Sequence, residues 1–197
     1  MLRLMCVVLT LALGACGGQK DDGAGKAGTP KGSALKNAPP ANPAKKVALI
    51  NESGDDTGAK ALLERFLKPG TDHLALSRAL RPKAADYAAV YAGDAAKKMD
   101  GVYGPAWDAD QIRVKPKEGQ TELLLWGATS EELKASTGNA PKFPGGYARV
   151  KDALKPGVRL YRFKFVKPGA KIGMAFDGLV HVNGRWVLIP KPWRALK

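Results

Sequence analysis

The spacing of apolar side chains changes along the chain, from a helical period before residue 104 to alternation after residue 120. In the first of these parts apolar residues recur at helical spacing, as Leu62 and Phe66 do, and this predicts short amphipathic helices. Lys68-Pro69-Gly70 ends the first helix, because proline and glycine do not continue one. We expect helices over Ala59–Leu67, over a segment capped by Thr71 or Asp72, over one opened by Pro82, and over Gly93–Tyr103.

The clearest strand lies near residue 163. Tyr161, Phe163 and Phe165 alternate with Arg162 and Lys164, which places three aromatic rings on one face of a half-exposed strand. The remaining elements expected before it are a strand over Thr121–Trp126, a short helix capped by Thr129 or Ser130 with Glu132, and a short helix over Tyr147–Leu154. Residues 47–50 fit a short strand or an apolar lead-in to the first helix.

Two hairpins follow. A turn at Lys167-Pro168-Gly169 leads to a second strand through Ile172, Met174 and Phe176, and Gly178 breaks or bulges the chain before a third strand. Asn183-Gly184 between apolar runs is the sequence of a type I′ turn. The pairs expected from this turn are Val182 with Arg185, His181 with Trp186, and Val180 with Val187. Trp193 and Leu196 are expected to cover an edge of the sheet.

These elements predict an α+β fold, in which N-terminal helices pack on a C-terminal antiparallel sheet of about four strands. Residues 47–197 are long enough to form one globular domain with its own core. We expect two segments before this domain: residues 1–15, which are removed, and residues 16–46, which are unfolded.

The first sixteen residues have the pattern of an export signal. Arg3 precedes an apolar run from Leu4 to Leu13, which is too short to span a bilayer. Leu13-Gly14-Ala15-Cys16 resembles the lipobox of bacterial lipoprotein precursors. The resemblance implies that residues 1–15 are a signal peptide, that the thiol of Cys16 receives a diacylglyceryl group, and that the new amine of Cys16 is acylated. Two or three acyl chains would anchor the protein to a membrane.

Residues 16–46 form a segment of Gly, Ala, Lys, Pro and Ser in which Leu35 is the only large apolar residue after the anchor. Such a composition does not bury enough surface to fold, so we expect a flexible tether. A coil of about 30 residues spans roughly 30 Å on average. The tether fits a solvated spacer, and its lysines also fit contacts with anionic head groups or wall polymers.

The chain is basic, with 32 Lys and Arg residues against 18 Asp and Glu residues and a net charge of +14. In the cell envelope this charge favours anionic partners, such as phospholipid head groups, lipid A phosphates or wall polymers. Nucleic acid would also suit the positive charge, but it is not the expected partner of a protein exported to the cell envelope. The cations are also spread along the chain, as on an ordinary soluble surface. Cys6 leaves with the signal peptide and Cys16 is consumed by lipidation, so no cysteine chemistry is expected in the mature domain.

Few residues suggest catalysis. Residues 47–197 contain two histidines, His73 and His181, so no site with several histidine ligands is expected, and the sequence predicts no metal, no cofactor and no catalytic set. His181 near Asp177 is the best general-base candidate, and a partly buried histidine packed on an aromatic ring is the alternative. Asp108 and Asp110 beside Trp107, in a loop after Pro105, fit a solvated loop better than a sugar or cation site.

A second resemblance is confined to about the last forty residues. Asp177-Gly178 followed by LVHVNGRWVLIP is similar to the final strands of the NTF2-like α+β cone, which encloses a pocket. The usual Asp-His pair of that superfamily has no match here. The resemblance implies a candidate pocket lined by Tyr161, Phe163, Phe165, Asp177, His181 and Trp186.

Two functions from different classes follow. The first is a membrane-anchored envelope lipoprotein with a non-enzymatic binding or scaffolding domain, and the alternative is an NTF2-like domain that binds or converts a small molecule. Because Gly17 rather than aspartate follows Cys16, the outer membrane is favoured if the organism has one. A filled core behind Tyr161, Phe163 and Phe165 would favour the first function, and a void there the second.

Overall fold

The computed structural model describes residues 52–196. The expected signal peptide, Cys16, the tether and residues 47–50 lie outside this range, and those predictions stay predictions. Within it, no helix has the length and apolar character needed to cross a membrane.

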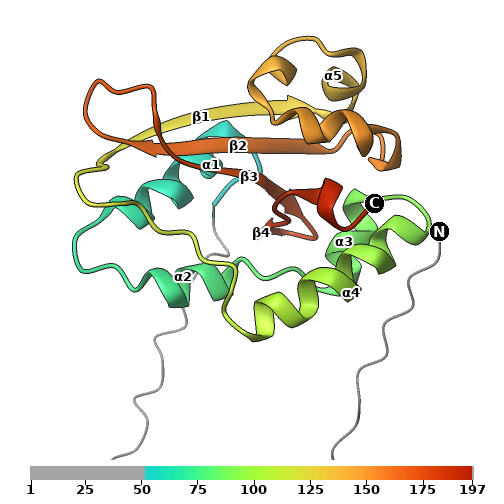
Figure 1. The fold of residues 1–197 in the computed structure, drawn as a ribbon, viewed down its shortest axis with the longest axis horizontal. Coiled ribbons are helices and arrows are strands. Elements are labelled where there is room, and N and C mark those ends of the chain that lie inside the picture. Colours follow the sequence, from blue (N-terminus) through green and yellow to red (C-terminus); the bar gives the residue numbers. More distant parts are fainter. Residues whose placement is uncertain (1–51, 197) are drawn as a thin grey trace, which may run out of the picture. The chain divides into compact units, whose positions relative to one another are not determined.

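The chain forms helices first and a sheet afterwards, as the sequence predicts (Figure 1). The first part contains α1 (Asp56–Glu64), η1 (Arg65–Leu67), α2 (His73–Ala79), α3 (Ala84–Val90) and α4 (Asp94–Asp108). The second contains β1 (Glu122–Thr129), α5 (Ser130–Ala135), η2 (Ala140–Lys142), η3 (Gly145–Arg149), η4 (Lys151–Ala153), β2 (Arg159–Val166), β3 (Gly173–Val182), β4 (Arg185–Leu188) and η5 (Pro192–Arg194), where η marks a 3₁₀ helix.

The four strands form one antiparallel sheet in the order β1-β2-β3-β4. In Figure 1, α2, α3 and α4 lie beside β3 and β4, whereas α5 and the turns after it lie beside the ends of β1 and β2. The α+β arrangement is therefore confirmed.

Local signals in the sequence set the starts of α2 and α5. The Asp72 carboxylate accepts a hydrogen bond of 2.9 Å from the amide of Ala75 and so caps α2, while the Thr71 hydroxyl donates to backbone carbonyls. Thr129 caps α5, and Glu132 completes a capping box. Four expectations were wrong: α1 begins at Asp56 rather than at Ala59, α3 begins at Ala84 rather than at Pro82, α4 continues to Asp108, and 147–154 forms 3₁₀ turns instead of one α-helix.

The final hairpin has the expected register. His181 pairs with Trp186, and Val182 and Val180 pair with their predicted partners across the turn. Asn183 and Gly184 have φ of 52° and 71°, the left-handed backbone that a type I′ turn requires.

A buried carboxylate fixes this turn to the helical part of the domain. Asp86 of α3 is 2% exposed, and its Oδ2 accepts from Arg185 Nη1 at 2.6 Å and from the Lys83 amide at 2.8 Å. Its Oδ1 accepts from Asn183 Nδ2 at 2.8 Å. A buried charge is stable only when it is paired and hydrogen-bonded, so this contact holds the turn end of β3 in one place.

A one-residue bulge lies inside β3. Tyr161 pairs with Leu179 and Arg162 pairs with Asp177, so Gly178 has no partner on β2. Gly178 has φ of +81°, and its carbonyl accepts a hydrogen bond of 2.9 Å from the amide of Ile189. The glycine therefore bulges one continuous strand rather than separating two strands. Ile172 lies outside the strand and is 87% exposed.

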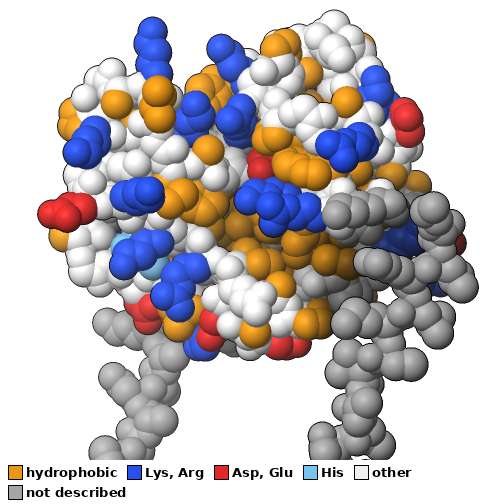
Figure 2. Space-filling view, viewed as in Figure 1, with side chains coloured by type: hydrophobic (Ala, Val, Ile, Leu, Met, Phe, Trp, Pro, Cys, Tyr) orange, Lys and Arg blue, Asp and Glu red, His pale blue; other side chains and the backbone are white. Residues whose placement is uncertain are grey.

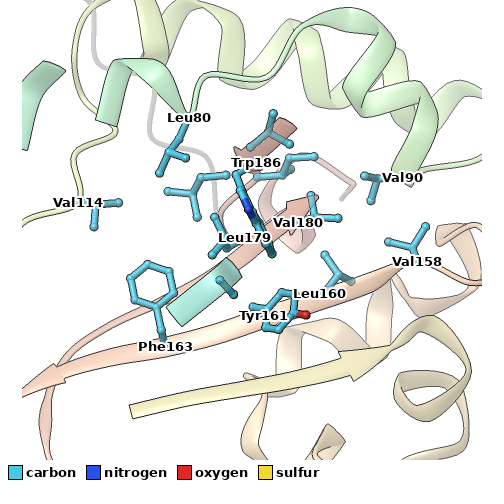
Figure 3. Packing of buried hydrophobic residues seen from close by; sticks show 14 of the residues in the cluster. Leu80, Val90, Val114, Val158, Leu160, Tyr161, Phe163, Leu179, Val180 and Trp186 are labelled. Atoms are coloured by element: carbon cyan, nitrogen blue, oxygen red, sulfur yellow. The ribbon is translucent and has the colours of Figure 1, made fainter. Parts of the chain in front are cut away.

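The core lies between the sheet and the helical part of the domain. In Figure 3, Leu179 and Trp186 lie between Leu80 and the aromatic rings of β2. Phe66 of η1 packs against Phe165, with ring centroids 6.3 Å apart. The face of β2 that carries its three aromatic residues is thus covered by helices.

Replacing Gly178 with alanine tests the bulge. A Cβ at this position would lie 1.9 Å from the carbonyl oxygen of Ile189, in addition to the cost of a left-handed backbone. We expect Gly178→Ala to lower the free energy of unfolding by more than about 2 kcal/mol, measured by urea denaturation. Gly70→Ala is the matched control, because Gly70 has φ of +73° and open space around it. It should cost about 1 kcal/mol, and equal losses in the two variants would contradict the close approach.

Candidate functional site

The candidate pocket residues of β2 and β4 lie in the core. Tyr161, Phe163, Phe165 and Trp186 are fully buried. Tyr161 and Trp186 have ring centroids 5.5 Å apart, and Phe163 stacks on Phe176 at 5.1 Å. These rings fill the space between the sheet and the helices.

Asp177 and His181 do not converge. The bulge at Gly178 adds one residue between them, so they point to opposite faces of the sheet although they are four residues apart. His181 lies on the face of Tyr161, with its ring 5.1 Å from that of Trp186 in an edge contact, and it is half-buried. This placement fits the interpretation of His181 as a histidine packed on an aromatic ring.

The other candidates also have local partners. His73 Nε2 hydrogen-bonds the carbonyl of Phe66 at 2.9 Å. Trp107 and Asp108 belong to the last turn of α4 rather than to a loop, and Trp107 is buried. Asp108 pairs with Arg81, and Asp110 pairs with Arg78 through both carboxylate oxygens. Across residues 52–196, no three His, Cys, Asp or Glu side chains gather where they could hold a metal ion.

Asp177 lines a cleft instead. This cleft of about 360 Å³ lies between α4, the segment that follows α4, the first half of β3 and the chain after β4. Its apolar wall includes Ile112, Met174, Phe176 and Leu188. A second hollow of about 420 Å³ shares Arg113, Met174 and Phe176 with it. We call the two together the β3 groove. Figure 2 shows hydrophobic side chains in a hollow near the centre of this face, with Lys and Arg side chains beside them.

Cations border the groove on two sides. Arg113, Lys115 and Lys117 lie on the segment after α4, and Lys191 and Arg194 lie after β4. The acidic residues lining it are Asp177 and Glu118. The groove therefore combines an apolar wall with a net positive border.

This border was not among the sites predicted from the sequence. Its first side is encoded in Arg113-Val114-Lys115-Pro116-Lys117, where cations alternate with apolar residues and Val114 is buried. That alternation was the available signal. The second side could not be paired with it, because Lys191 and Arg194 lie more than seventy residues away in the sequence.

Asp177 is a buried carboxylate with one well-satisfied oxygen. It is 5% exposed, and its Oδ1 accepts from the Lys191 amide at 2.9 Å and from the Tyr147 hydroxyl at 3.2 Å. Within the described part of the chain it has no salt bridge within 4.0 Å, and no described hydrogen bond ends on Oδ2. Burial raises the pKa of Asp177, against the opposing effects of these hydrogen bonds and the charges of Lys191 and Arg162.

Three tyrosines surround this carboxylate. Burial, with the charge of Asp177 as the next cause, raises the pKa of Tyr103 to about 12 and also raises the pKa values of Tyr91 and Tyr147 well above the usual value. Tyr103 donates to the carbonyl of Lys191 at 2.8 Å, while the buried hydroxyl of Tyr91 has no hydrogen-bond partner among the described residues. All three phenols stay protonated at neutral pH, so they do not act as bases, and Tyr103 and Tyr147 donate hydrogen bonds.

Comparison of the chain with protein-family models, with curated proteins and with solved structures found no match.

Replacing Asp177 with asparagine tests its environment. Because burial raises its pKa, the folded protein binds this proton more tightly than the unfolded chain does. The charge therefore destabilises the fold above the raised pKa, and this effect fades as the pH falls toward 3.8. We expect Asp177→Asn to raise the unfolding free energy at pH 7, with a gain that shrinks as the pH approaches 4.

Urea denaturation at several pH values measures this difference. Asp152→Asn, at an exposed aspartate, is the control for removing one acid from a basic protein. A loss of stability at pH 7 in Asp177→Asn, or a gain independent of pH, would contradict the assignment.

Proposed function

We propose that this chain is the precursor of a lipid-anchored envelope lipoprotein whose domain binds a partner in the β3 groove. The lipobox-like Leu13-Gly14-Ala15-Cys16 supports the anchor. The groove carries the proposal for the domain, because an apolar wall bordered by cations suits a partner that is both apolar and anionic.

The residues of the groove favour binding over catalysis. Its lining contains no histidine, serine, threonine or cysteine. Asp177 is held by Tyr147 and by the amide of Lys191, and the phenol of Tyr103 is engaged with a carbonyl. A nucleophile with an adjacent base, which covalent catalysis needs, is not assembled by these side chains.

The proposed location follows from the first residues of the chain. Acylated Cys16 holds the protein on a membrane, and residues 17–46 allow the domain to reach partners roughly 30 Å away. Gly17 favours the outer membrane in an organism that has one. Basic residues of the domain then favour anionic envelope components over neutral ones.

A second candidate is a domain of the NTF2-like kind that binds or converts a small molecule. The observation that favours it is the size of the first cleft, about 360 Å³, which lies within the range of roughly 300–1,000 Å³ typical of ligand pockets. Asp177 and Tyr103 would supply polar contacts there. This candidate uses the groove in place of the aromatic core.

Exchange of Cys16 tests the anchor. We expect Cys16→Ser to abolish incorporation of a fatty-acid label and to move the protein from the membrane fraction to the soluble fraction, because the thiol is the attachment point. Cys6→Ser is the matched control and should keep both properties, since Cys6 leaves with the signal peptide. Labelling of the Cys16→Ser chain would contradict the proposal.

Site-specific photo-crosslinking in the producing cells tests the binding site. A photoreactive residue at Lys117, on the border of the groove, should give discrete adducts, whereas one at the exposed Lys97 of α4 should give few. Adducts of a few hundred daltons would favour the small-molecule candidate. Equal yields at the two positions would contradict the groove as the binding site.

A further inference from the structure

The first half of β3 has a free edge. β4 pairs only with Leu179–Val182, whereas Gly173–Asp177 pairs only with β2. No described residue forms a backbone hydrogen bond with the other side of Gly173–Asp177. Amide and carbonyl groups that point away from β2 in this segment therefore lack a protein partner within residues 52–196.

The β3 groove runs along that edge. Met174, Ala175, Phe176 and Asp177 all line it. Side chains of a strand point alternately to its two faces, so a hollow on one face would touch only every second residue. Four consecutive residues indicate a hollow beside the strand. The free segment of five residues is roughly 17 Å long.

Proteins normally protect such edges with charges, prolines, bulges or a covering segment. Here the bulge at Gly178 ends the free segment, and the chain around Arg113–Glu118 leaves a hollow between itself and β3. The opposite edge of the sheet is β1, where the carbonyl of Gly127 accepts a hydrogen bond of 3.0 Å from Asn139 Nδ2. The free segment of β3 lines an apolar groove that has cations on two sides.

We propose that an extended segment of a partner protein, with alternating apolar and acidic side chains, binds here as a fifth strand beside Gly173–Asp177. This inference rests on the proposed function, because it names the partner of the same groove. Main-chain hydrogen bonds to β3 supply affinity, as in other cases of strand addition. Apolar side chains contact Met174 and Phe176, and acidic ones face Arg113, Lys115 and Lys117.

The free backbone favours a peptide over a lipid. An acyl chain would fill the apolar part of the groove but would leave the amides and carbonyls of β3 unpaired, which is costly once water is excluded. Charge argues against the chain's own tether as the occupant, because residues 17–46 contain six lysines and two aspartates. A cationic segment would be repelled by the cations at the border.

A library of random twelve-residue peptides displayed on phage, selected on the full mature chain, supplies the probe. We expect selected peptides to carry net negative charge and alternating apolar residues. Each is then synthesised with its natural backbone and with N-methyl groups on every second amide, which removes donors without changing charge. N-methylation should weaken binding at least tenfold if the peptide adds as a strand.

Charge-reversal variants locate the site. The triple variant Arg113→Glu, Lys115→Glu, Lys117→Glu should lose at least tenfold in peptide affinity. These side chains are exposed, so the variant should keep the thermal unfolding midpoint of the parent protein. Lys97→Glu with Lys98→Glu, at exposed positions of α4 outside the groove, is the matched control and should leave affinity unchanged.

The outcomes separate this inference from the proposed function. If N-methylated peptides bind as tightly as those with a natural backbone, and the triple variant loses this binding, strand addition is overturned and the groove stays the binding site. If no peptides are selected, and the protein binds anionic phospholipid vesicles but the triple variant does not, strand addition is overturned in favour of a lipid partner. Binding that the triple variant retains in full would overturn both proposals.

Discussion

The bulge at Gly178 is the constraint on which the groove depends. It leaves Gly178 without a partner on β2. The Gly178 carbonyl accepts a hydrogen bond from the amide of Ile189, and the carbonyl oxygen of Ile189 lies where a Cβ on residue 178 would be. The bulge turns Asp177 to the face opposite Leu179. It also brings the chain after β4 beside β3, where the amide of Lys191 reaches the carboxylate of Asp177. The buried acid and one border of the groove thus follow from a single backbone irregularity.

The two ends of β3 are held differently. At the turn end, Asn183 and Arg185 bind the buried Asp86, and β4 completes the ladder. At the other end, Gly173–Asp177 has β2 on one side and the groove on the other. Gly173–Asp177 is therefore already extended before a partner strand binds. Little conformational entropy is lost by this protein on binding, because the segment does not have to become ordered.

Local sequence signals predicted much of the fold because their physics is local. Asn183-Gly184 determined the turn and thereby the pairing of His181 with Trp186. The alternation of Tyr161, Phe163 and Phe165 predicted three aromatic rings on one face of a strand, and the structure buries that face. Asp72 and Thr129 capped helices near the expected positions. The ends of α3 and α4 were missed, since those depend on packing as well as on propensity.

The groove could not be predicted in the same way. Gly178 was compatible with a break or a bulge, and the choice depends on the approach of Ile189, which is a tertiary contact. Without the bulge, Asp177 and His181 would share a face, as their spacing in the sequence suggests. The borders of the groove come from segments near residues 103–118, 174–177 and 188–194, so no single stretch of sequence carries its pattern.

Amide hydrogen exchange along β3 in the free protein would show directly whether the edge of Gly173–Asp177 is open. We expect rapid exchange at the amides of Gly173–Asp177 that point away from β2, and strong protection at Leu179–Val182, where β3 lies between β2 and β4. Uniform protection through Gly173–Asp177 would show that this edge is already covered, and it would contradict a groove that is open for a partner strand.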